Sequence, residues 1–322
     1  MVQQNLPLML VGMPGCGKTD IMREIAKLTE RHLFLLHPVI DSPEDYKGFP
    51  MFQEGKADFY PLGILRDILN AREPTLVGID DLGQAPGANQ ASLMQWVHRR
   101  NRELSGRKMP DCVSIMAASN RREDNAGVAG FLDPLKDRWT SIVEVGISLA
   151  SWSKWAATHN IDPRVISYLH LRPNNLSTFE ANKGIERTAT PRGWESMSDM
   201  LAIPIPAGTQ LEVYSGIVGK AVASEFFEFL QVEKELPNPR DIESGTYTKV
   251  PNEGNVKYAI IAALAHRGDN EYALTNIIKY VLQFKGEFQK LWELMYTNKH
   301  PEMMQSEAWG LWVRKTAKST TI

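Results

Sequence analysis

The stretch GMPGCGKT, residues 12–19, decides the fold of this chain. It matches the pattern G-x-x-x-x-G-K-[ST], in which a glycine-rich loop turns its backbone N–H groups toward the phosphates of a nucleotide. An apolar run at 8–11 precedes the loop, and a segment with helical periodicity follows it at 20–30. Because the motif requires this strand–loop–helix context, the sequence predicts a site for a nucleoside triphosphate, with ATP and Mg²⁺ as the expected cofactors.

The positions of this loop have separate expected roles. Lys18 is expected to reach the β- and γ-phosphates, and the Thr19 hydroxyl is expected to ligate Mg²⁺. Cys16 occupies a spacer position, and we interpret it as a small filler. The residues predicted to bind the nucleotide are Gly12, Pro14, Gly15, Cys16, Gly17, Lys18, Thr19 and Asp20.

Apolar runs and helix-like stretches alternate over the first part of the chain. Apolar strands separated by helices indicate a parallel sheet that is covered on both faces. We therefore predict an α/β fold: an αβα core with a parallel five-stranded sheet, followed by an all-helical lid and C-terminal helices. The strands are expected at residues 8–11, 32–40, 75–80, 112–119 and 140–145.

After Ser148 the pattern becomes helical throughout. The polar stretch at 232–255 contains prolines and glycines, so we predict a long loop there, followed by two or three helices that end near Arg314. The expected divisions are a nucleotide-binding core at 1–147, a helical lid at 148–231, and a loop with a C-terminal helical extension at 232–322.

Residues 45–63 read as a small hairpin inserted into a helical segment of the core. The insert is dense in aromatic residues, and we interpret these rings as the hydrophobic core of the hairpin in preference to contacts with a substrate. They are Tyr46, Phe49, Phe52, Phe59 and Tyr60. The C-terminal tryptophans Trp292, Trp309 and Trp312 are likewise expected to lie in a core.

Two acids end the predicted strand in TLVGIDDL, residues 75–82. Asp80 is expected to hold Mg²⁺ through water, and Asp81 to orient or deprotonate the attacking water. The alternative is that both acids cap the helix that begins near Pro86. Asn120 ends the next strand, where its amide can position water beside the γ-phosphate; the alternative is an Asx turn that closes the strand.

Arginines supply the positive charge that a transferring phosphoryl group needs. Arg138 in LDPLKDRW and Arg192 in TATPRGWE are the two candidates for catalysis, although each alone could be a solvated surface charge. Further candidates that the sequence does not rank are Arg99, Arg100, Arg121 and Arg122.

The 322 residues are nearly balanced in charge, with 36 basic and 38 acidic side chains. This balance argues against a protein that coats nucleic acid or a membrane surface, though it does not exclude nucleic acid. The two cysteines argue against a disulfide framework. The N-terminus lacks a signal peptide pattern, and no apolar run is long enough to cross a bilayer, so we expect a cytoplasmic protein without a membrane partner.

The succession GMPGCGKT, DYKGFP, LVGIDDLGQA, AASNRRED, LDPLKDRW and TPRGWE resembles the AAA+ ATPases of the MoxR-like group, in the clade with an insert in helix 2. The resemblance covers about residues 6–200. It implies an αβα core and a helical lid, with ATP bound between subunits of a ring, usually a hexamer. It further implies that the insert at 45–63 lines the central pore of that ring.

The resemblance also implies a role for each motif residue. Lys18 and Thr19 match the Walker A residues, and Asp80 and Asp81 match the Walker B pair. Asn120 matches sensor 1, Arg138 the arginine finger that acts in trans, and Arg192 sensor 2 on the lid. Asp81 departs from the glutamate that many relatives carry, so turnover is expected to be slow.

The leading hypothesis is therefore a ring-forming ATPase that remodels or activates a separate protein partner, one with a von Willebrand A domain in many relatives. A DNA-directed AAA+ motor or loader is one alternative. A nucleotide-gated scaffold with slow turnover is another, and Asp81 keeps it open. A metabolite kinase is the weakest, because it would need a second substrate pocket in place of a lid sensor and a finger.

Overall fold

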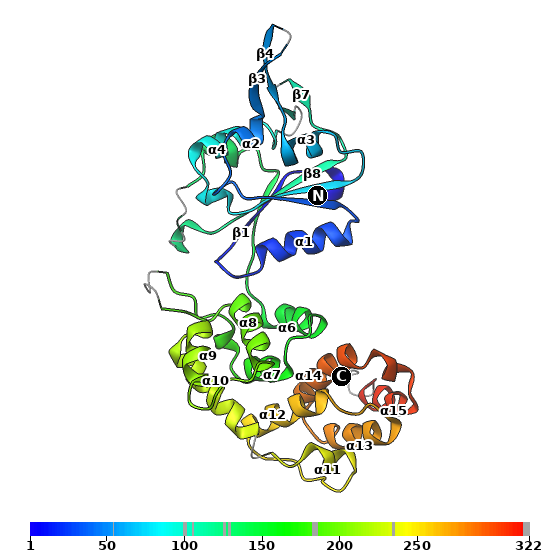
Figure 1. Ribbon diagram of the computed structural model, residues 1–322. Helices are drawn as coiled ribbons and strands as arrows, with labels where there is room; N and C mark the ends of the chain where they lie inside the picture. Colours follow the sequence, from blue (N-terminus) through cyan, green and yellow to red (C-terminus); the bar gives the residue numbers. More distant parts are fainter. Residues whose placement is uncertain are drawn as a thin grey trace. The chain divides into compact units, whose positions relative to one another are not determined.

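The computed structural model describes residues 1–53, 55–98, 102–104, 106–124, 127, 130–181, 186–233 and 236–317. The chain folds as two compact units (Figure 1). The first is Met1–Gly146, and the second begins at Ile147 and contains the rest of the chain, apart from a short stretch at Glu180 that groups with the first.

A parallel five-stranded sheet forms the centre of the first unit, with the order β2-β5-β8-β1-β9. The central strands β5 and β8 are buried along their whole length. This sheet confirms the predicted α/β fold. Its strands are β1 (Leu8–Val11), β2 (His32–Leu36), β5 (Thr75–Ile79), β8 (Val113–Ser119) and β9 (Ser141–Glu144).

Helices cover both faces of the sheet, because successive side chains of its strands enter two separate hydrophobic clusters. On one face Leu76 and Met116 pack with Met22 of α1 (Lys18–Leu28). On the other, Val77 and Ile115 belong to the cluster that contains α3 and α4. The remaining helical elements of the unit are α2 (Glu44–Lys47), α3 (Gly63–Leu69), α4 (Gly87–Leu93), α5 (Asp133–Lys136), η1 (Val2–Gln4), η2 (Leu82–Gln84) and η3 (Arg122–Asp124).

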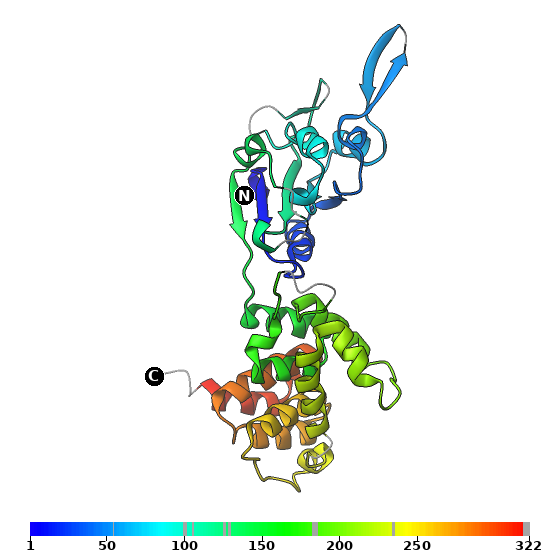
Figure 2. The same ribbon diagram turned by 90° about the vertical axis from the view of Figure 1, so that its left-hand side faces the viewer.

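The predicted insert forms an antiparallel hairpin of β3 (Phe49–Gln53) and β4 (Lys56–Tyr60), which projects from the body of the first unit (Figure 2). Beside it lies a smaller ribbon of β6 (Glu103–Leu104) and β7 (Arg107–Lys108), whose Arg107 lies over the Tyr60 ring. Tyr46 is buried below the hairpin, but the three phenylalanines are exposed. The prediction that these rings form a hairpin core is therefore wrong for Phe49, Phe52 and Phe59, which are 51%, 77% and 42% exposed.

The described part of the second unit consists of helices joined by loops, without a strand, and one hydrophobic cluster extends through it from Trp152 to Trp312. Trp292, Trp309 and Trp312 are buried in this cluster, as predicted. Its helices are α6 (Leu149–Thr158), α7 (Pro163–Leu171), η4 (Pro173–Leu176), α8 (Pro191–Leu201), α9 (Gln210–Val218), α10 (Lys220–Glu233), α11 (Pro239–Glu243), α12 (Gly254–Ala265), α13 (Glu271–Val281), α14 (Gly286–Lys299), η5 (Pro301–Gln305) and α15 (Glu307–Thr316).

Three details differ from the sequence-based expectations. The stretch 232–255 contains the short helix α11, in which Asn238 caps the first turn and Pro239 occupies the first helical position. Four α-helices, not two or three, follow α11 in the described residues. Strand β2 ends at Leu36 and not at residue 40, because a turn closed by Asp41 begins at His37. Among the described residues, no helix has the length and apolar character that a bilayer span needs.

Candidate functional site

In the loop between β1 and α1, glycine occupies two positions with a left-handed backbone and one position where a side chain would not fit. Gly15 and Gly17 have φ angles of +75° and +91°, a region that favours glycine. At Gly12, an added Cβ would lie 2.9 Å from the carbonyl oxygen of Val145, just after β9. The loop ends at the N-terminus of the 11-residue helix α1, where unpaired backbone N–H groups and the helix dipole attract anions.

Lys18 is the charged group of this loop, and it is 6% exposed. Its Nζ donates to the carbonyl oxygens of Gly12 and Met13, both at 3.0 Å, and to Oδ1 of Asn120 at 2.8 Å. A buried ammonium is stable only when it is paired in this way. The ammonium is thus held in contact with Asn120, which follows β8, the strand next to β1 in the sheet.

Thr19 and Asp80 bring two oxygen ligands together. The Thr19 hydroxyl donates to Oδ2 of Asp80 at 2.8 Å, and Oδ1 of Asp80 accepts from the Asp81 backbone N–H at 3.1 Å. Mg²⁺ prefers hard oxygen ligands and is often bound by one or two protein groups together with substrate phosphates. No cluster of three or more His, Cys, Asp or Glu side chains suitable for another metal occurs within the described chain.

Asn120 connects the lysine to the second acid. Its Nδ2 donates to Oδ1 of Asp81 at 3.3 Å and to Oε1 of Gln84 at 3.1 Å, while its Oδ1 accepts from Lys18. All these residues lie beyond the carboxyl ends of the neighbouring strands β5, β8 and β1, which is where open α/β sheets bind ligands. Sequence reasoning missed Gln84; the only signal was its position three residues after Asp81 in the turn η2.

The structural alternatives for these polar residues are not borne out. The cap of α4 is Pro86, and the helix receives no side-chain cap hydrogen bond from the acids. The Asn120 amide bonds to three side chains from two other motifs and does not close a turn. Because the cluster buries charged and polar groups that no packing need requires, it is a functional-site candidate.

The remaining predicted site residues lie outside this network. Asp20 pairs with Arg23 at 2.7 Å on the exposed side of α1. Arg138 is half-buried, and its Nη1 donates to the Met94 carbonyl oxygen at 2.5 Å. Arg192 is the second residue of α8 and belongs to the helical unit. The roles assigned to Arg138 and Arg192 stay predictions, as does that of Pro14, which is half-buried in the loop.

The other arginines considered for catalysis are Arg99, Arg100, Arg121 and Arg122, and those that the structure describes differ in whether their side chains are paired. Arg121 pairs with Asp124 at 2.9 Å and with Glu144 at 3.1 Å. The hydrogen bonds that Arg121 donates to the carboxylate of Asp124, and then to that of Glu144, raise the pKa of its guanidinium, so this side chain is paired within its own chain. Arg122 is exposed in η3, and Arg99 and Arg100 lie outside the described residues.

A comparison with models of protein families finds one match. Residues 7–139 match the model of a family described as the AAA domain (dynein-related subfamily). No curated protein is significantly similar to the chain in sequence.

Among solved structures, a mutant of RuvB from Thermotoga maritima matches with 15% identity and a TM-score of 0.40, covering 80% of this chain and 75% of that one. NtrX from Brucella abortus in complex with ATP matches with 14% identity and a TM-score of 0.39. That match covers 99% of this chain and 65% of NtrX, so the chain spans less than two thirds of NtrX.

Proposed function

We propose that this protein binds ATP with Mg²⁺ at the loop 12–19 and hydrolyses it. The observation that carries the proposal is the buried network that joins Lys18 through Asn120 to Asp81. The network links the phosphate-binding cation to the acid expected to activate water, and it does so across three strands of the sheet. The family match over residues 7–139 supports the same reading.

The residues fit the cofactor by the chemistry of their donors. The left-handed glycines bend the loop so that backbone N–H groups and the start of α1 can receive phosphate oxygens. Lys18 can exchange the carbonyl oxygens of Gly12 and Met13 for phosphate oxygens, since all are acceptors of the same ammonium. Thr19 and Asp80 would hold Mg²⁺, directly or through water.

When bound, ATP with Mg²⁺ supplies the phosphoanhydride bond that is cleaved and the charge shielding of its phosphates. The chain's own contribution is to orient a water and accept its proton. The Asn120 amide donates to Oδ1 of Asp81 at 3.3 Å and so orients the carboxylate that would accept the proton. Lys18 and the helix dipole of α1 stabilise the negative charge that develops on the phosphoryl oxygens.

We further propose that the active protein is a ring, a hexamer of the MoxR-like type, in which Arg138 of one subunit completes the site of its neighbour and Arg192 acts from the helical unit. Within the described residues, the guanidinium of the half-buried Arg138 donates one hydrogen bond, to the Met94 carbonyl oxygen, and its other N–H groups have no acceptor there. A protein partner, such as one with a von Willebrand A domain, is the proposed client. The exposed Phe49, Phe52 and Phe59 support a contact with another macromolecule.

The test is the rate of ATP hydrolysis per subunit over a wide range of protein concentration. Wild type should show a rate per subunit that rises steeply with protein concentration. Arg138→Ala should abolish this rise, because each active site would then lack the arginine that the neighbouring subunit supplies. Arg66→Ala, an exposed arginine on α3, is the matched control and should behave like wild type.

A rate per subunit that is flat with concentration and indifferent to Arg138 would refute the shared site. Absence of hydrolysis with intact nucleotide binding would instead favour the scaffold with slow turnover. Salt-sensitive binding to DNA would favour the DNA-directed motor over a protein client. The expected cytoplasmic location stays a prediction.

A further inference from the structure

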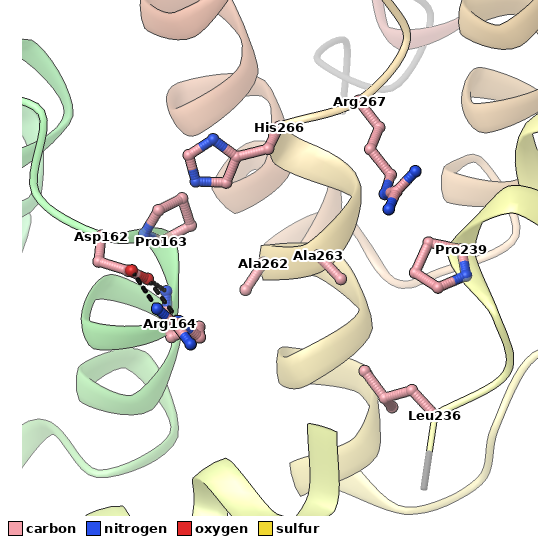
Figure 3. Close-up of a pocket in the computed structure, with 9 residues that line it drawn as sticks. All are labelled: Asp162, Pro163, Arg164, Leu236, Pro239, Ala262, Ala263, His266 and Arg267. Atoms are coloured by element: carbon pink, nitrogen blue, oxygen red, sulfur yellow. Dashed lines mark hydrogen bonds and ion pairs between the residues drawn. The ribbon is translucent and has the colours of Figure 1, made fainter. Parts of the chain in front are cut away.

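The helical unit contains a hollow of about 410 Å³ among the start of α7, the second half of α12 and the segment that leads into α11 (Figure 3). Its two guanidinium groups are already paired, Arg164 with Asp162 at 2.6 Å and Arg267 with Glu243 at 3.0 Å. The wall that α12 provides is covered, since Ala262 is only 1% exposed. The hollow therefore gives no indication of a ligand.

Gln84 lies instead within the proposed nucleotide site, and the function proposed above gives it no role. Asp81 has a φ angle of +51°, and the Gln84 backbone N–H donates to the Asp81 carbonyl oxygen at 2.9 Å, so the turn η2 folds back beyond the end of β5. Within this turn Gly83 lies against the end of β8, because an added Cβ would collide with Oγ of Ser119. The turn therefore holds Gln84 beside Asn120, which is the next residue after β8.

The polarity of the Gln84 amide follows from the lysine of the loop. An ammonium has only donors, so the Asn120 atom that contacts Lys18 at 2.8 Å must be the oxygen Oδ1. The Asn120 nitrogen Nδ2 is then the donor toward Gln84 at 3.1 Å, and the Gln84 atom that it meets must be the acceptor Oε1. The Nε2 end of Gln84 is therefore the donor end of this amide.

The same nitrogen of Asn120 holds both Asp81 and Gln84. Its Nδ2 donates to Oδ1 of Asp81 at 3.3 Å as well as to Oε1 of Gln84 at 3.1 Å. The carboxylate and the amide therefore lie side by side, and both side chains are half-buried, so a water molecule can reach them. This pair combines an acceptor with a group that also carries N–H donors.

A water that attacks phosphorus needs two partners, an acceptor for its proton and a donor that fixes its oxygen. An ionised carboxylate such as that of Asp81 supplies only the acceptor. A neutral amide supplies the donor without placing another negative charge beside the phosphates, and in some nucleotide hydrolases a glutamine orients the attacking water in this way. Gln84 therefore offers the function that Asp81 lacks.

We propose that Gln84 is a second catalytic residue of the ATP hydrolysis proposed above, on which this inference rests. Its Nε2 donates to the attacking water while Asp81 accepts the proton. The water oxygen forms a bond to the γ-phosphorus, the bond from that phosphorus to the bridging oxygen of the leaving ADP breaks, and one proton of the water passes to the Asp81 carboxylate. Gln84 orients the water and neither gains nor loses a proton.

The test compares the affinity of the full-length protein for ADP with its affinity for ADP and aluminium fluoride, both measured by isothermal titration with Mg²⁺. Aluminium fluoride beside ADP mimics the transferring phosphoryl group with the attacking water in line, so its binding depends on the groups that hold that water. Steady-state ATP hydrolysis is measured on the same proteins.

Two variants separate the two ends of the amide. Gln84→Glu keeps an acceptor for Asn120 and loses the donor, and Gln84→Met loses both without adding a charge. Gln3→Glu, at an exposed position in η1, is the matched control. Unchanged circular dichroism and melting temperature establish that each variant is folded.

We expect wild type and Gln3→Glu to bind ADP more tightly with aluminium fluoride than without it. In both Gln84 variants this gain in affinity should fall at least about tenfold and kcat about 100-fold, because the water loses an oriented donor. KM and the affinity for ADP alone should stay within about threefold of wild type, because the phosphate-binding loop is unchanged.

Three results would each overturn the proposal. If Gln84→Glu kept the wild-type kcat and the wild-type gain in affinity, only the contact of Oε1 with Asn120 would matter. If Gln84→Met kept them, Gln84 would have no role in hydrolysis. If both variants lost as much affinity for ADP alone as for ADP with aluminium fluoride, Gln84 would serve nucleotide binding. Failure of the proposed function itself would appear in wild type, as an absence of hydrolysis, and is distinct from these three results.

Discussion

Asn120→Asp replaces the amide nitrogen of a buried side chain by oxygen. It keeps the contact of this side chain with Lys18 and removes the hydrogen bonds that it donates to Asp81 and Gln84. The variant keeps Oδ1, which accepts from Lys18 at 2.8 Å. It replaces the Nδ2 donor, 3.3 Å from Oδ1 of Asp81 and 3.1 Å from Oε1 of Gln84, by an oxygen that cannot donate when ionised. The lysine therefore keeps its acceptor, while Asp81 loses the group that orients it.

The magnitudes indicate that the variant folds but does not turn over. With an effective dielectric constant of about 20, two charges at the 3.3 Å separation from Asp81 repel by about 5 kcal/mol. The new charge at 2.8 Å from the Lys18 ammonium gains about 6 kcal/mol on the same scale. The two terms nearly cancel, so the free energy of unfolding should change little. Asp81, however, now shares a proton with its neighbour or is pushed away from it, and it no longer serves as a proton acceptor.

The assay is steady-state ATP hydrolysis together with direct titration of a fluorescent ATP analogue. General-base catalysis contributes about 10²–10⁴-fold, so we expect kcat to fall about 100-fold or more. The dissociation constant for the nucleotide should stay within about threefold of wild type, because the lysine and the loop are intact. Asn120→Ala is the comparison: it loses both contacts, and its nucleotide binding should also weaken.

Hydrolysis by Asn120→Asp at the wild-type rate would refute the reasoning, since Asp81 would then act without the amide. A loss of nucleotide affinity as large as the loss of kcat would contradict the expectation that the variant affects hydrolysis and not binding. It would mean that Asn120 serves the phosphate-binding lysine and has no separate contact with the catalytic acid.

Further predictions concern the ligand set, the loop and the helical core. Thr19→Val should weaken ATP binding about tenfold in the presence of Mg²⁺ and leave it unchanged in EDTA, because the lost hydroxyl acts through the cation. An equal loss of affinity with Mg²⁺ and with EDTA would contradict the assignment of Thr19 as a metal ligand. Gly12→Ala should lower the free energy of unfolding in urea by about 1–3 kcal/mol and abolish nucleotide binding, since its Cβ would lie 2.9 Å from the Val145 carbonyl oxygen. If the variant bound nucleotide with wild-type affinity, the loop would be able to relax around the added methyl group. Trp312→Ala should cost about 3–5 kcal/mol in the same denaturation assay because the indole is 0% exposed, whereas Val313→Ala, at a 49% exposed position on the same helix, should change it by less than about 0.5 kcal/mol.

The parts of the site that follow strands could be predicted from the sequence. Apolar runs locate the strands of a buried parallel sheet, and the polar residue that ends each run must then appear at one edge. Lys18, Asp80 and Asn120 follow this logic, and the structure brings them together. The contact between Asn120 and Gln84 could not be predicted, because it depends on the turn geometry of η2 and not on a spacing rule.

Other features depend on tertiary context that a local pattern does not contain. Phe49, Phe52 and Phe59 look like a hairpin core in sequence, but two strands alone have no second layer on which to bury them. Helix α11 lies in a stretch that contains several prolines. Its prediction was not possible because a proline can begin a helix as well as end one. The roles proposed for Arg138 and Arg192 would depend on a neighbouring subunit and on the placement of the helical unit, which no residue pattern in a single chain can specify.

The backbone at Asp81 bears on why this chain carries aspartate at a position where glutamate is common among the proteins it resembles. Asp81 has a φ angle of +51°, and aspartate adopts this left-handed conformation more readily than most residues because its short side chain can bond locally. Asp81→Glu would lengthen the reach of the carboxylate but would also place a less tolerant residue in that backbone conformation. The left-handed backbone at this position therefore favours aspartate over glutamate, and lengthening the side chain would not by itself speed the proposed hydrolysis.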